Sequence, residues 1–374
     1  MQDYCWQWFD LNELRPRSKQ VYGSMLRSVI VPHWGPRPVG EITSLEYDVW
    51  KTRIRGKYSH NYAAQVLGLF RMLMDDAVVR YKLRSETPVI EQRRRGRYTK
   101  KQTRRAKQAM PIEVVHQLAA NSYHVWGFTG WVYIWTIACT GMRPPGEMWG
   151  LQRGYSSVHW PDADPDSRRR SDGRKRYTGQ HVLRVQVQLY YADGQPTLAG
   201  PKYDSDRTLV LPPFLHEMHE ALLASHASPW VFPALKGGSL LGAHFARDYW
   251  HPARDGRPER CDRKGTVRAG LDGVEGMSGQ DLYRLRHWHK ELMDEPGADI
   301  ARVAVEVRMG HELPGVEGVY SFVTPAMEAR IVDYLQEVWE KMVAKGLWLP
   351  PFPNRLPSEG AGDTPPLFSG VREI

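Results

Sequence analysis

One stretch of the sequence, residues 92–108, contains nine lysines or arginines and no acidic residue. A run of this kind is usually a solvated, flexible segment, but this one lies between two hydrophobic regions. It therefore predicts two folded domains, residues 1–91 and 110–345, joined by a basic linker, residues 92–109. The chain of 374 residues is long enough for each domain to bury its own core.

Hydrophobic periodicity predicts that the first domain is helical. Apolar residues between Arg17 and Pro32 recur at helical spacing and form one face. The sequence Thr43-Ser44-Leu45-Glu46 has the form of a capping box and predicts the start of a second helix. Ser59 is in a position to cap a third helix, whose apolar residues again fall on one face.

The second domain is predicted to combine helices with a few strands. Pro111 is expected to start a helix. The apolar run 131–139 is expected to form a further helix that ends near Thr140-Gly141. Residues 278–345 are expected to be mainly helical. Thr324-Pro325 is a start signal for the last of these helices.

Two segments are expected to form the strands. Residues 182–191 alternate apolar and polar side chains, and residues 207–211 form a second apolar run. Asp193-Gly194 is a turn signal. Residues 346–374 are rich in proline and glycine and are predicted to be a disordered tail.

Composition favours a soluble protein with a polyanionic partner. Lysine and arginine exceed the acidic residues by 51 to 42, giving a net charge of +9. The longest apolar run, residues 131–139, is about half of the ~20 residues that a membrane span needs, so no membrane partner is expected. The acidic, aromatic N-terminus is typical of neither a signal peptide nor a transit peptide. Three widely spaced cysteines predict no disulfide framework and favour a cytoplasmic location.

Four segments of the second domain contain residues suited to phosphate chemistry. In order, they are Thr140-Gly141-Met142-Arg143, then Lys202 with Arg207 five residues later, then Tyr283-Arg284-Leu285-Arg286-His287, and finally Gly310-His311 with Tyr320 nine residues later. Guanidinium groups bind phosphate oxygens through paired donors and are permanently charged. Each segment alone is a weak signal, because short motifs of this kind occur by chance.

Taken together and in this order, the four segments resemble the signature of tyrosine recombinases of the phage-integrase type. The pattern from Tyr22 through Val31-Pro32-His33-Trp34-Gly35 to Ile42-Thr43 is similar to the helical core-binding domain of that family, so the resemblance covers roughly residues 10–335. It implies an α+β, mostly helical fold. The expected parts are a helical core-binding (SAM-like) domain and a catalytic domain with a small antiparallel sheet. Because the pattern starts near Met1, a further N-terminal arm-binding domain is expected to be absent or truncated.

The resemblance also implies an enzyme and a set of site residues. Tyr320 would be the nucleophile that forms a 3′-phosphotyrosine link, and Arg143 and Arg286 would hold the scissile phosphate. His311, or a group in the segment of Tyr283 to His287, would promote loss of the tyrosine proton or donate to the phosphate, and Lys202 would protonate the departing 5′ oxygen. The phosphotyrosine ester preserves the energy of the broken bond, so no cofactor is expected, and no cysteine–histidine set has zinc spacing.

Two positions depart from the family pattern. The carboxylate that usually follows the first arginine by three residues is here Glu147, four residues after Arg143, and the two prolines between them can be absorbed before a helix starts. Tyr283 stands where the family usually has a histidine. A tyrosine can donate a hydrogen bond to phosphate but cannot transfer a proton near neutral pH. His287 and His289 lie close by in sequence but face different sides of a helix.

The expected partner is double-stranded DNA carrying an attachment site. The resemblance further implies a homotetramer on DNA, with an excisionase or a host DNA-bending factor as candidate accessory partners, and a cytoplasmic, nucleoid-associated location. The linker would add contacts to DNA phosphates. The residues expected to make these contacts are Arg93, Arg94, Arg95, Arg97, Lys100, Lys101, Arg104 and Arg105.

Two alternatives remain at this stage. One is a decayed integrase that binds DNA without cutting it, which the altered first segment and Tyr283 would support. The other is a relaxing topoisomerase with the same tyrosine chemistry, which would need no tetramer. Retention of Arg143, Lys202, Arg286, His311 and Tyr320 favours an enzyme, since binding alone needs no nucleophile.

Overall fold

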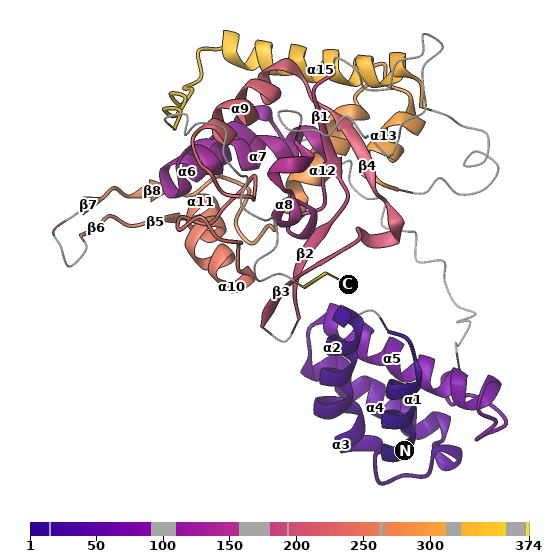
Figure 1. Ribbon diagram of the computed structural model, residues 1–374. Helices are drawn as coiled ribbons and strands as arrows, with labels where there is room; N and C mark the ends of the chain where they lie inside the picture. The colour runs from indigo at the N-terminus through magenta and orange to yellow at the C-terminus, as the bar shows by residue number, and fades with distance from the viewer. Residues whose placement is uncertain are drawn as a thin grey trace. The chain divides into compact units, whose positions relative to one another are not determined.

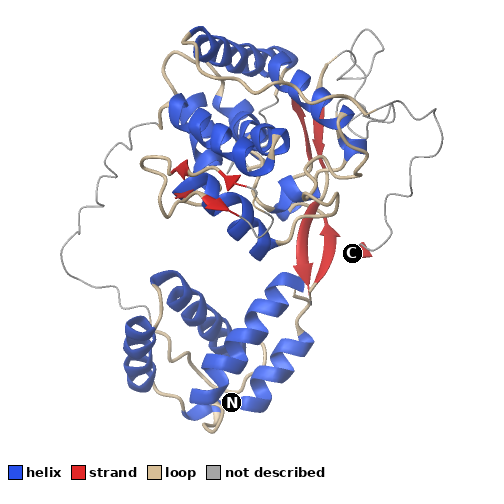
Figure 2. Ribbon diagram, turned by 90° about the vertical axis from the view of Figure 1, so that its left-hand side faces the viewer, coloured by secondary structure: helices blue, strands red, loops and turns tan. Residues whose placement is uncertain are grey.

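The computed structural model describes residues 1–14, 16–90, 110–156, 180–192, 194–261, 265, 267–311, 323–356 and 372–373. The chain forms two compact units, Met1–Ala106 and Lys107–Ile374, and each has its own hydrophobic core. Helices predominate in both units, and the described strands lie in the larger one (Figure 2). The predicted α+β, mostly helical class is confirmed.

The first unit is built of helices that follow the predicted apolar faces. Residues 17–32, predicted as one helix, lie in three consecutive helical segments, and Ser59 precedes α5 without a side-chain capping bond. The capping box at Thr43 is confirmed: the Thr43 hydroxyl accepts from the Glu46 amide at 3.3 Å, and the Thr43 amide donates to the Glu46 carboxylate at 2.9 Å. The segments are α1 (Gln2–Leu11), α2 (Pro16–Met25), η1 (Leu26–Ile30), α3 (Val31–Trp34), η2 (Val39–Glu41), α4 (Ser44–Lys57) and α5 (His60–Val79).

Aromatic side chains fill the core of this first unit. Trp34, Trp50 and Phe70 are buried against one another, with ring centroids 5.0–5.6 Å apart. Two polar contacts tie the first helix to the last: the Tyr4 hydroxyl donates to the Leu73 carbonyl at 2.6 Å, and the Trp8 indole donates to Asp76 at 2.5 Å. These two bonds satisfy the Tyr4 and Trp8 donors and fix α1 relative to α5.

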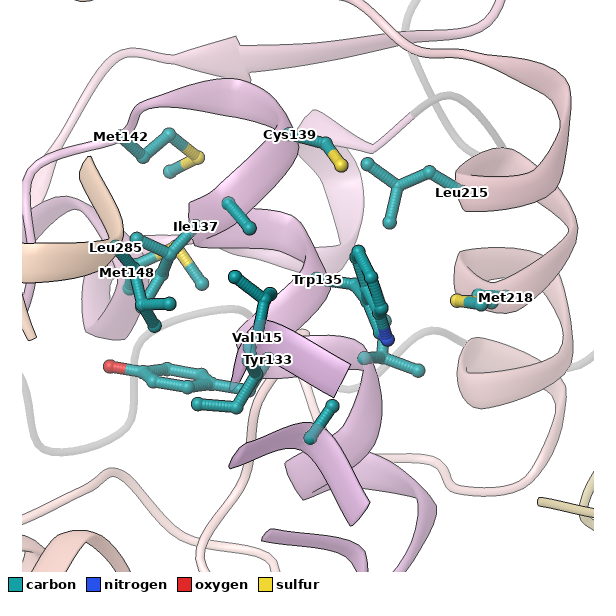
Figure 3. Close-up of a cluster of buried hydrophobic side chains, with 14 of the residues drawn as sticks. Val115, Tyr133, Trp135, Ile137, Cys139, Met142, Met148, Leu215, Met218 and Leu285 are labelled. Atoms are coloured by element: carbon teal, nitrogen blue, oxygen red, sulfur yellow. The ribbon is translucent and has the colours of Figure 1, made fainter. Parts of the chain in front are cut away.

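The second unit is arranged around helix α7, whose side chains are nearly all buried. In Figure 3, residues of α7 such as Trp135 and Ile137 meet residues of α6, α9 and α12, among them Val115, Leu215 and Leu285. A helix that is hydrophobic on all sides belongs in a protein core, and no helix among the described residues is long and apolar enough to cross a membrane. The helical segments are α6 (Ile112–Trp126), α7 (Phe128–Thr140), α8 (Gly146–Gly150), η3 (Arg153–Tyr155), η4 (Lys202–Asp204), α9 (Pro213–Ala224), α10 (Gly242–Phe245), η5 (Ala246–Trp250), α11 (His251–Asp255), α12 (Tyr283–Met293), α13 (Arg302–Met309) and α15 (Pro325–Ala344).

The first predicted strand differs from the sequence prediction. Residues 182–191 were expected to form one strand, but they are divided between β1 (Val182–Val185) and β2 (Gln188–Ala192), which belong to different sheets. The turn at Gly194 reverses the chain at once, so β2 pairs with the adjacent β3 (Gln195–Ala199), while β1 pairs antiparallel with β4 (Arg207–Val210). A short strand, β9 (Arg372–Glu373), pairs parallel with β3.

A narrow two-stranded ribbon that the sequence analysis did not predict follows α11. β5 (Gly256–Arg257) pairs with β8 (Leu271–Asp272), and β6 (Arg260–Cys261) pairs with β7 (Val267–Arg268), both antiparallel. Figure 1 shows this ribbon extending outward from the helices of the second unit. Its strands are only two residues long, too short for the alternating pattern that sequence analysis relies on.

The prediction of a disordered tail is wrong for residues 346–356, which pack on the second unit. The ring of Trp348 lies against His124 and Trp131, with centroids 5.9 Å from each, and Phe352 contacts Phe128 at 5.4 Å. The prediction followed proline and glycine content, but Trp348 and Phe352 make ring contacts with α6 and α7, although about half of each side chain remains exposed. The predicted tail residues 357–371 and 374 lie outside the described residues.

Candidate active site

The first arginine segment begins where α7 ends, at a glycine in a left-handed conformation. Gly141 has a φ of +64° and its amide donates to the Ile137 carbonyl at 2.9 Å, closing the helix as predicted. A Cβ on Gly141 would lie 2.5 Å from the Met309 sulfur and 2.7 Å from the His289 ring. Only glycine fits this position, and it turns the chain so that Arg143 enters the site.

Replacing Gly141 by alanine is expected to lower the free energy of unfolding of the second unit by about 2–4 kcal/mol. The left-handed conformation costs roughly 1–2 kcal/mol for a residue with a Cβ, and the overlaps with Met309 and His289 add overpacking of similar size. Hydrogen exchange of α7 amides measures this loss. Gly297→Ala is the matched control, because a Cβ there meets nothing within 4 Å. Equal stability of the two variants would show that the site can relax around the added methyl group.

Arg143 is held by a buried carboxylate that the four-residue spacing places within reach. Glu147, which is 1% exposed, accepts from the Arg143 amide at 2.7 Å and from Arg143 Nη1 at 2.9 Å. The same carboxylate accepts from Arg207 Nη2 at 2.8 Å and Nη1 at 3.1 Å. Burial alone would raise the pKa of Glu147, but the charges and hydrogen bonds of Arg207 and Arg143 lower the pKa below its ordinary value. The two prolines precede α8, so the extra residue is absorbed before that helix begins.

Arg286 comes from α12 and is almost fully buried beside Arg143. Its Nη2 donates to the Met309 carbonyl at 2.6 Å and contacts His311 Nε2 at 2.9 Å, and its Nη1 donates to the Gly141 carbonyl. Burial lowers the pKa of Arg286 to about 10, with repulsion from Arg143 in the same direction. The guanidinium group therefore remains charged near neutral pH.

His311 follows α13 and lies between Arg286 and a carboxylate. Its Nδ1 is 2.6 Å from Glu306 Oε2, and Glu306 also accepts from Lys290. Because Nδ1 faces a carboxylate and Nε2 faces an arginine donor, the hydrogen bonds assign the proton to Nδ1, and the Nε2 lone pair accepts from Arg286 Nη2. Burial lowers the pKa of His311, and the hydrogen bond to Glu306 opposes this shift.

Tyr283 lies at the start of α12, half-buried next to the two arginines. Burial raises the pKa of its hydroxyl, while Arg286 and Arg143 lower it in part. Of the two nearby histidines, His287 is exposed, whereas His289 is completely buried and bonds through Nδ1 to the Ala138 carbonyl at 2.8 Å. His289 is thus a core residue, whereas the Tyr283 hydroxyl is close enough to Arg286 and Arg143 for their charges to lower its pKa.

Lys202 lies in the exposed 3-10 turn between β3 and β4 and is tied to the arginine cluster through Ser205. The Ser205 hydroxyl donates to the Lys202 carbonyl at 2.8 Å and accepts from Arg143 Nη1 at 2.6 Å. The structure therefore brings four predicted segments together: those of Arg143, Lys202, Arg286 and His311. Tyr320 and the eight predicted linker cations, Arg93 to Arg105, lie outside the described residues.

Several residues of this region were not recognised from the sequence as functional. Arg207 was noted only for its spacing from Lys202, yet it binds Glu147 and donates through Nε to the Arg308 carbonyl at 2.8 Å. Glu306 and Ser205 were not noted at all. The sequence did contain one signal, because Arg207 lies inside an apolar strand and a buried arginine requires an acidic partner. That partner, Glu147, is too distant in sequence to be identified from the strand alone.

The cluster is suited to binding an anion. Arg143 and Arg207 pair with the buried carboxylate of Glu147, and Arg286 lies beside them, so positive charge is in excess among these residues. Preorganised cations of this kind stabilise negative charge that develops on a phosphate during displacement. Among the described residues, no group of three or more histidine, cysteine, aspartate or glutamate side chains could hold a metal ion.

Comparison with known proteins finds similarity in structure only. No model of a protein family matches the sequence, and no curated protein matches it either. A Tn1549 transposon integrase fragment solved in complex with a circular intermediate DNA aligns with a TM-score of 0.56 at 14% identity, over 89% of this chain and 98% of that chain.

Two further solved structures are similar. The same integrase in complex with transposon right end DNA aligns with a TM-score of 0.54 at 13% identity, over 91% of this chain and 98% of that one. A lambda integrase dimer bound to a core site aligns with a TM-score of 0.50 at 9% identity, over 87% and 98%. At these identities the similarity concerns the fold. The chain has the fold of the tyrosine recombinases and integrases.

Proposed function

We propose that this chain is a site-specific DNA recombinase of the integrase type, which integrates or excises a phage or mobile element. Residues 1–91 would bind the core site, and residues 110–345 would cut and rejoin the strands through a 3′-phosphotyrosine link to Tyr320. The similar Tn1549 and lambda integrases were solved bound to DNA, which supports DNA as the partner of this fold.

The observation that carries the proposal is the convergence of two arginines on the glycine–histidine segment. Arg143 Nη2 donates to the Gly310 carbonyl, and Arg286 Nη2 lies between the Met309 carbonyl and His311 Nε2. These side chains come from segments more than twenty residues apart in sequence. The cluster would bind the two non-bridging oxygens of a phosphodiester and stabilise the charge they gain.

The proposed cleavage step conserves atoms and charge. The Tyr320 hydroxyl oxygen attacks phosphorus, the bond from phosphorus to the 5′ oxygen breaks, and the DNA remains linked to the tyrosine through its 3′ phosphate. Arg286 Nη2 turns from His311 Nε2 to the phosphate, the phenolic proton passes to the Nε2 lone pair that this releases, and Lys202 supplies a proton to the departing 5′ oxygen. Attack by a 5′ hydroxyl reverses each transfer and rejoins a strand. Tyr283 would donate a hydrogen bond to the phosphate.

The proposed assembly on DNA has further parts. The linker cations, Arg93, Arg94, Arg95, Arg97, Lys100, Lys101, Arg104 and Arg105, would contact DNA phosphates and make binding strongly salt-dependent. Four copies would act together at paired attachment sites, with α15 as a candidate docking element between subunits. An excisionase or a host DNA-bending factor would be an accessory partner, and the protein would act in the cytoplasm on the nucleoid.

Covalent trapping on a nicked substrate tests this function. The substrate carries the attachment core, identified in the DNA that flanks the gene, and its nick lets the short fragment with the free 5′ hydroxyl diffuse away. The wild type is expected to form an adduct that survives denaturation, and Tyr320→Phe is expected to form none. Such a result would also show that Tyr283 and the Arg143–Glu147 spacing permit catalysis.

A different result would favour the second candidate function. Tyr283 occupies the place of a proton-transferring histidine, and this observation favours a decayed integrase that only binds DNA. Salt-sensitive, site-specific binding with no adduct from the wild type would refute the enzyme and support that candidate. Adducts on any supercoiled DNA, without a requirement for the core sequence, would instead indicate a topoisomerase.

The rate of adduct formation is expected to depend on the ionisation of His311. As the proton acceptor, His311 must be neutral, and its pKa is lowered, so the rate should rise with pH through a pKa below the ordinary ~6.5 of histidine. Because Glu306 raises the pKa of His311, Glu306→Gln should move this acidic limb to still lower pH. It should also slow the reaction by roughly 10–100-fold, part of the about 10²–10⁴-fold that a general base contributes.

Single-turnover rates on the nicked substrate across pH 5–8 measure this effect. Glu291→Gln is the matched control, because Glu291 pairs with Arg284 at 2.9 Å and does not contact His311. An acidic limb that stays in place in Glu306→Gln would show that another group accepts the phenolic proton.

A further inference from the structure

The turn that carries Lys202 has an unusual backbone. Tyr203 and Asp204 both have positive φ angles, 62° and 47°, although neither is glycine. Consecutive non-glycine residues in the left-handed region are unfavourable and persist only when surrounding contacts hold them. Tyr203 is 70% exposed, so its own side chain supplies little packing. The contacts that hold this turn must come from elsewhere.

Ser205, directly after the two strained residues, supplies such a contact. Its hydroxyl donates its one proton to the Lys202 carbonyl at 2.8 Å and uses a lone pair to accept from Arg143 Nη1 at 2.6 Å. The first bond closes the turn across the strained residues. The second fixes the turn to the guanidinium group proposed to bind the scissile phosphate.

The position of Ser205 itself is fixed by two neighbours, Arg207 and Gly310. Its carbonyl accepts from Arg207 Nη1 at 3.0 Å, and Arg207 is in turn held by the carboxylate of Glu147. Its Cβ lies 3.1 Å from the place that a Cβ on Gly310 would occupy, so the serine packs closely on the glycine that precedes His311. Ser205 is therefore located where the segments of Arg143, Lys202 and His311 meet.

We propose that Ser205 is a positioning residue that sets Lys202 relative to the Arg143-bound phosphate, so that Lys202 reaches the departing 5′ oxygen. The proposal rests on the proposed recombinase function and concerns one step in it. As the bond from phosphorus to the 5′ oxygen breaks, that oxygen takes the electron pair and receives a proton from the Lys202 ammonium group, which becomes neutral. Without the Ser205 hydroxyl, Lys202 would lose its fixed place.

The chemistry of the leaving group separates this role from a structural one. A bridging sulfur in place of the 5′ oxygen leaves as a thiolate without needing a proton, because a thiol has a pKa near ~8.5 against ~15.7 for water. A variant that impairs only the delivery of the proton should therefore recover on the sulfur substrate. A variant that impairs phosphate binding should remain slow on both.

The experiment compares single-turnover adduct formation on 5′-oxygen and 5′-sulfur versions of the nicked substrate. Ser205→Ala is expected to be roughly 100-fold slow with oxygen, at the low end of the range for proton transfer, and within about threefold of the wild type with sulfur. Lys202→Ala should show the same pattern, and Arg143→Ala should be slow with both. Ser205→Thr, which keeps the hydroxyl, should restore the oxygen reaction. Ser225→Ala, which removes a hydroxyl at the end of α9, is the matched control.

Each result either supports or overturns the role of Ser205. Recovery with sulfur supports it, and recovery cannot arise from misfolding, because a misfolded variant would be slow on both substrates. An equal defect on both substrates, or no defect, would overturn it. If the wild type forms no adduct with either substrate, the proposed recombinase function is refuted, and the role of Ser205 is refuted with it.

Discussion

Glu147→Gln is expected to lower the free energy of unfolding of the second unit by about 3–5 kcal/mol, the usual cost of removing one partner from a buried ion pair. The Glu147 carboxylate is 1% exposed and accepts from both Arg143 and Arg207. An uncharged amide would leave the buried Arg207 without a counter-ion and would add its own donor beside two cations. Both effects oppose folding.

The same substitution is expected to slow adduct formation, because the amide cannot hold Arg143 from both its backbone and its side chain. Hydrogen exchange of amides in α8 and β4 would measure the stability, and the nicked substrate would measure the rate. Glu337→Gln on α15 is the matched control. Glu337 forms exposed ion pairs with Arg330 and Lys341 at 3.3 and 4.0 Å. Removing its charge should therefore lower the free energy of unfolding by at most about 1 kcal/mol.

A double variant distinguishes a lost ion pair from general damage to the site. Adding Arg207→Met to Glu147→Gln removes the stranded charge, and replacing both partners costs less than removing one. Part of the lost stability should therefore return. Additive losses from the two substitutions would show that Glu147 and Arg207 are not coupled, contrary to the two hydrogen bonds between them.

Local signals in the sequence predicted much of the helical structure. The capping box at Thr43 forms both of its hydrogen bonds, Gly141 ends α7 in the left-handed conformation, and the Thr324 hydroxyl accepts from the Met327 amide at the start of α15. Each of these features depends on residues within four positions of one another. Helix signals of this range can be interpreted without knowing the rest of the fold.

Features that depend on distant partners were predicted less well. The alternation in residues 182–191 does not reveal that the strand changes sheets, because pairing depends on which segment the chain brings alongside. The order in residues 346–356 likewise depends on surfaces of α6 and α7 that receive Trp348 and Phe352. Composition describes the segment alone and cannot supply that partner.

In the candidate site, too, the residues found by motif spacing were predicted, whereas those that depend on distant partners were not. Motif spacing identified Arg143, Lys202, Arg286 and His311, which the structure places around one cluster. The residues that hold them were missed, since Glu147 and Arg207 are 60 positions apart. Arg308 is a further example. It is buried, its Nη1 and Nη2 donate to the carbonyls of Val210 and Cys139, and nothing adjacent in sequence indicates this role.

Lowering the pH from 7.5 to 5.0 is expected to cost the second unit about 4 kcal/mol of unfolding free energy through two core histidines. His219 and His289 are completely buried; burial lowers the pKa of His219 to about 3 and holds the pKa of His289 well below the ordinary range. In the unfolded chain both have a pKa near ~6.5. Below that pH the unfolded chain binds protons that the folded unit cannot take up, so stability falls as pH falls, by about 2 kcal/mol for each histidine over this interval.

Hydrogen exchange of α7 and α9 amides at the two pH values, corrected for the intrinsic exchange rate, would measure this loss. His219→Gln keeps a polar partner for the Thr136 hydroxyl, which lies 2.8 Å from His219 Nε2, and cannot be protonated. Whatever its stability at pH 7.5, this variant should lose about 2 kcal/mol less than the wild type on acidification. His287→Gln, an exposed position on α12, should lose as much as the wild type. Equal acid sensitivity in all three proteins would contradict the assignment, because the neutral buried imidazole of His219 could then not be what limits folding at low pH.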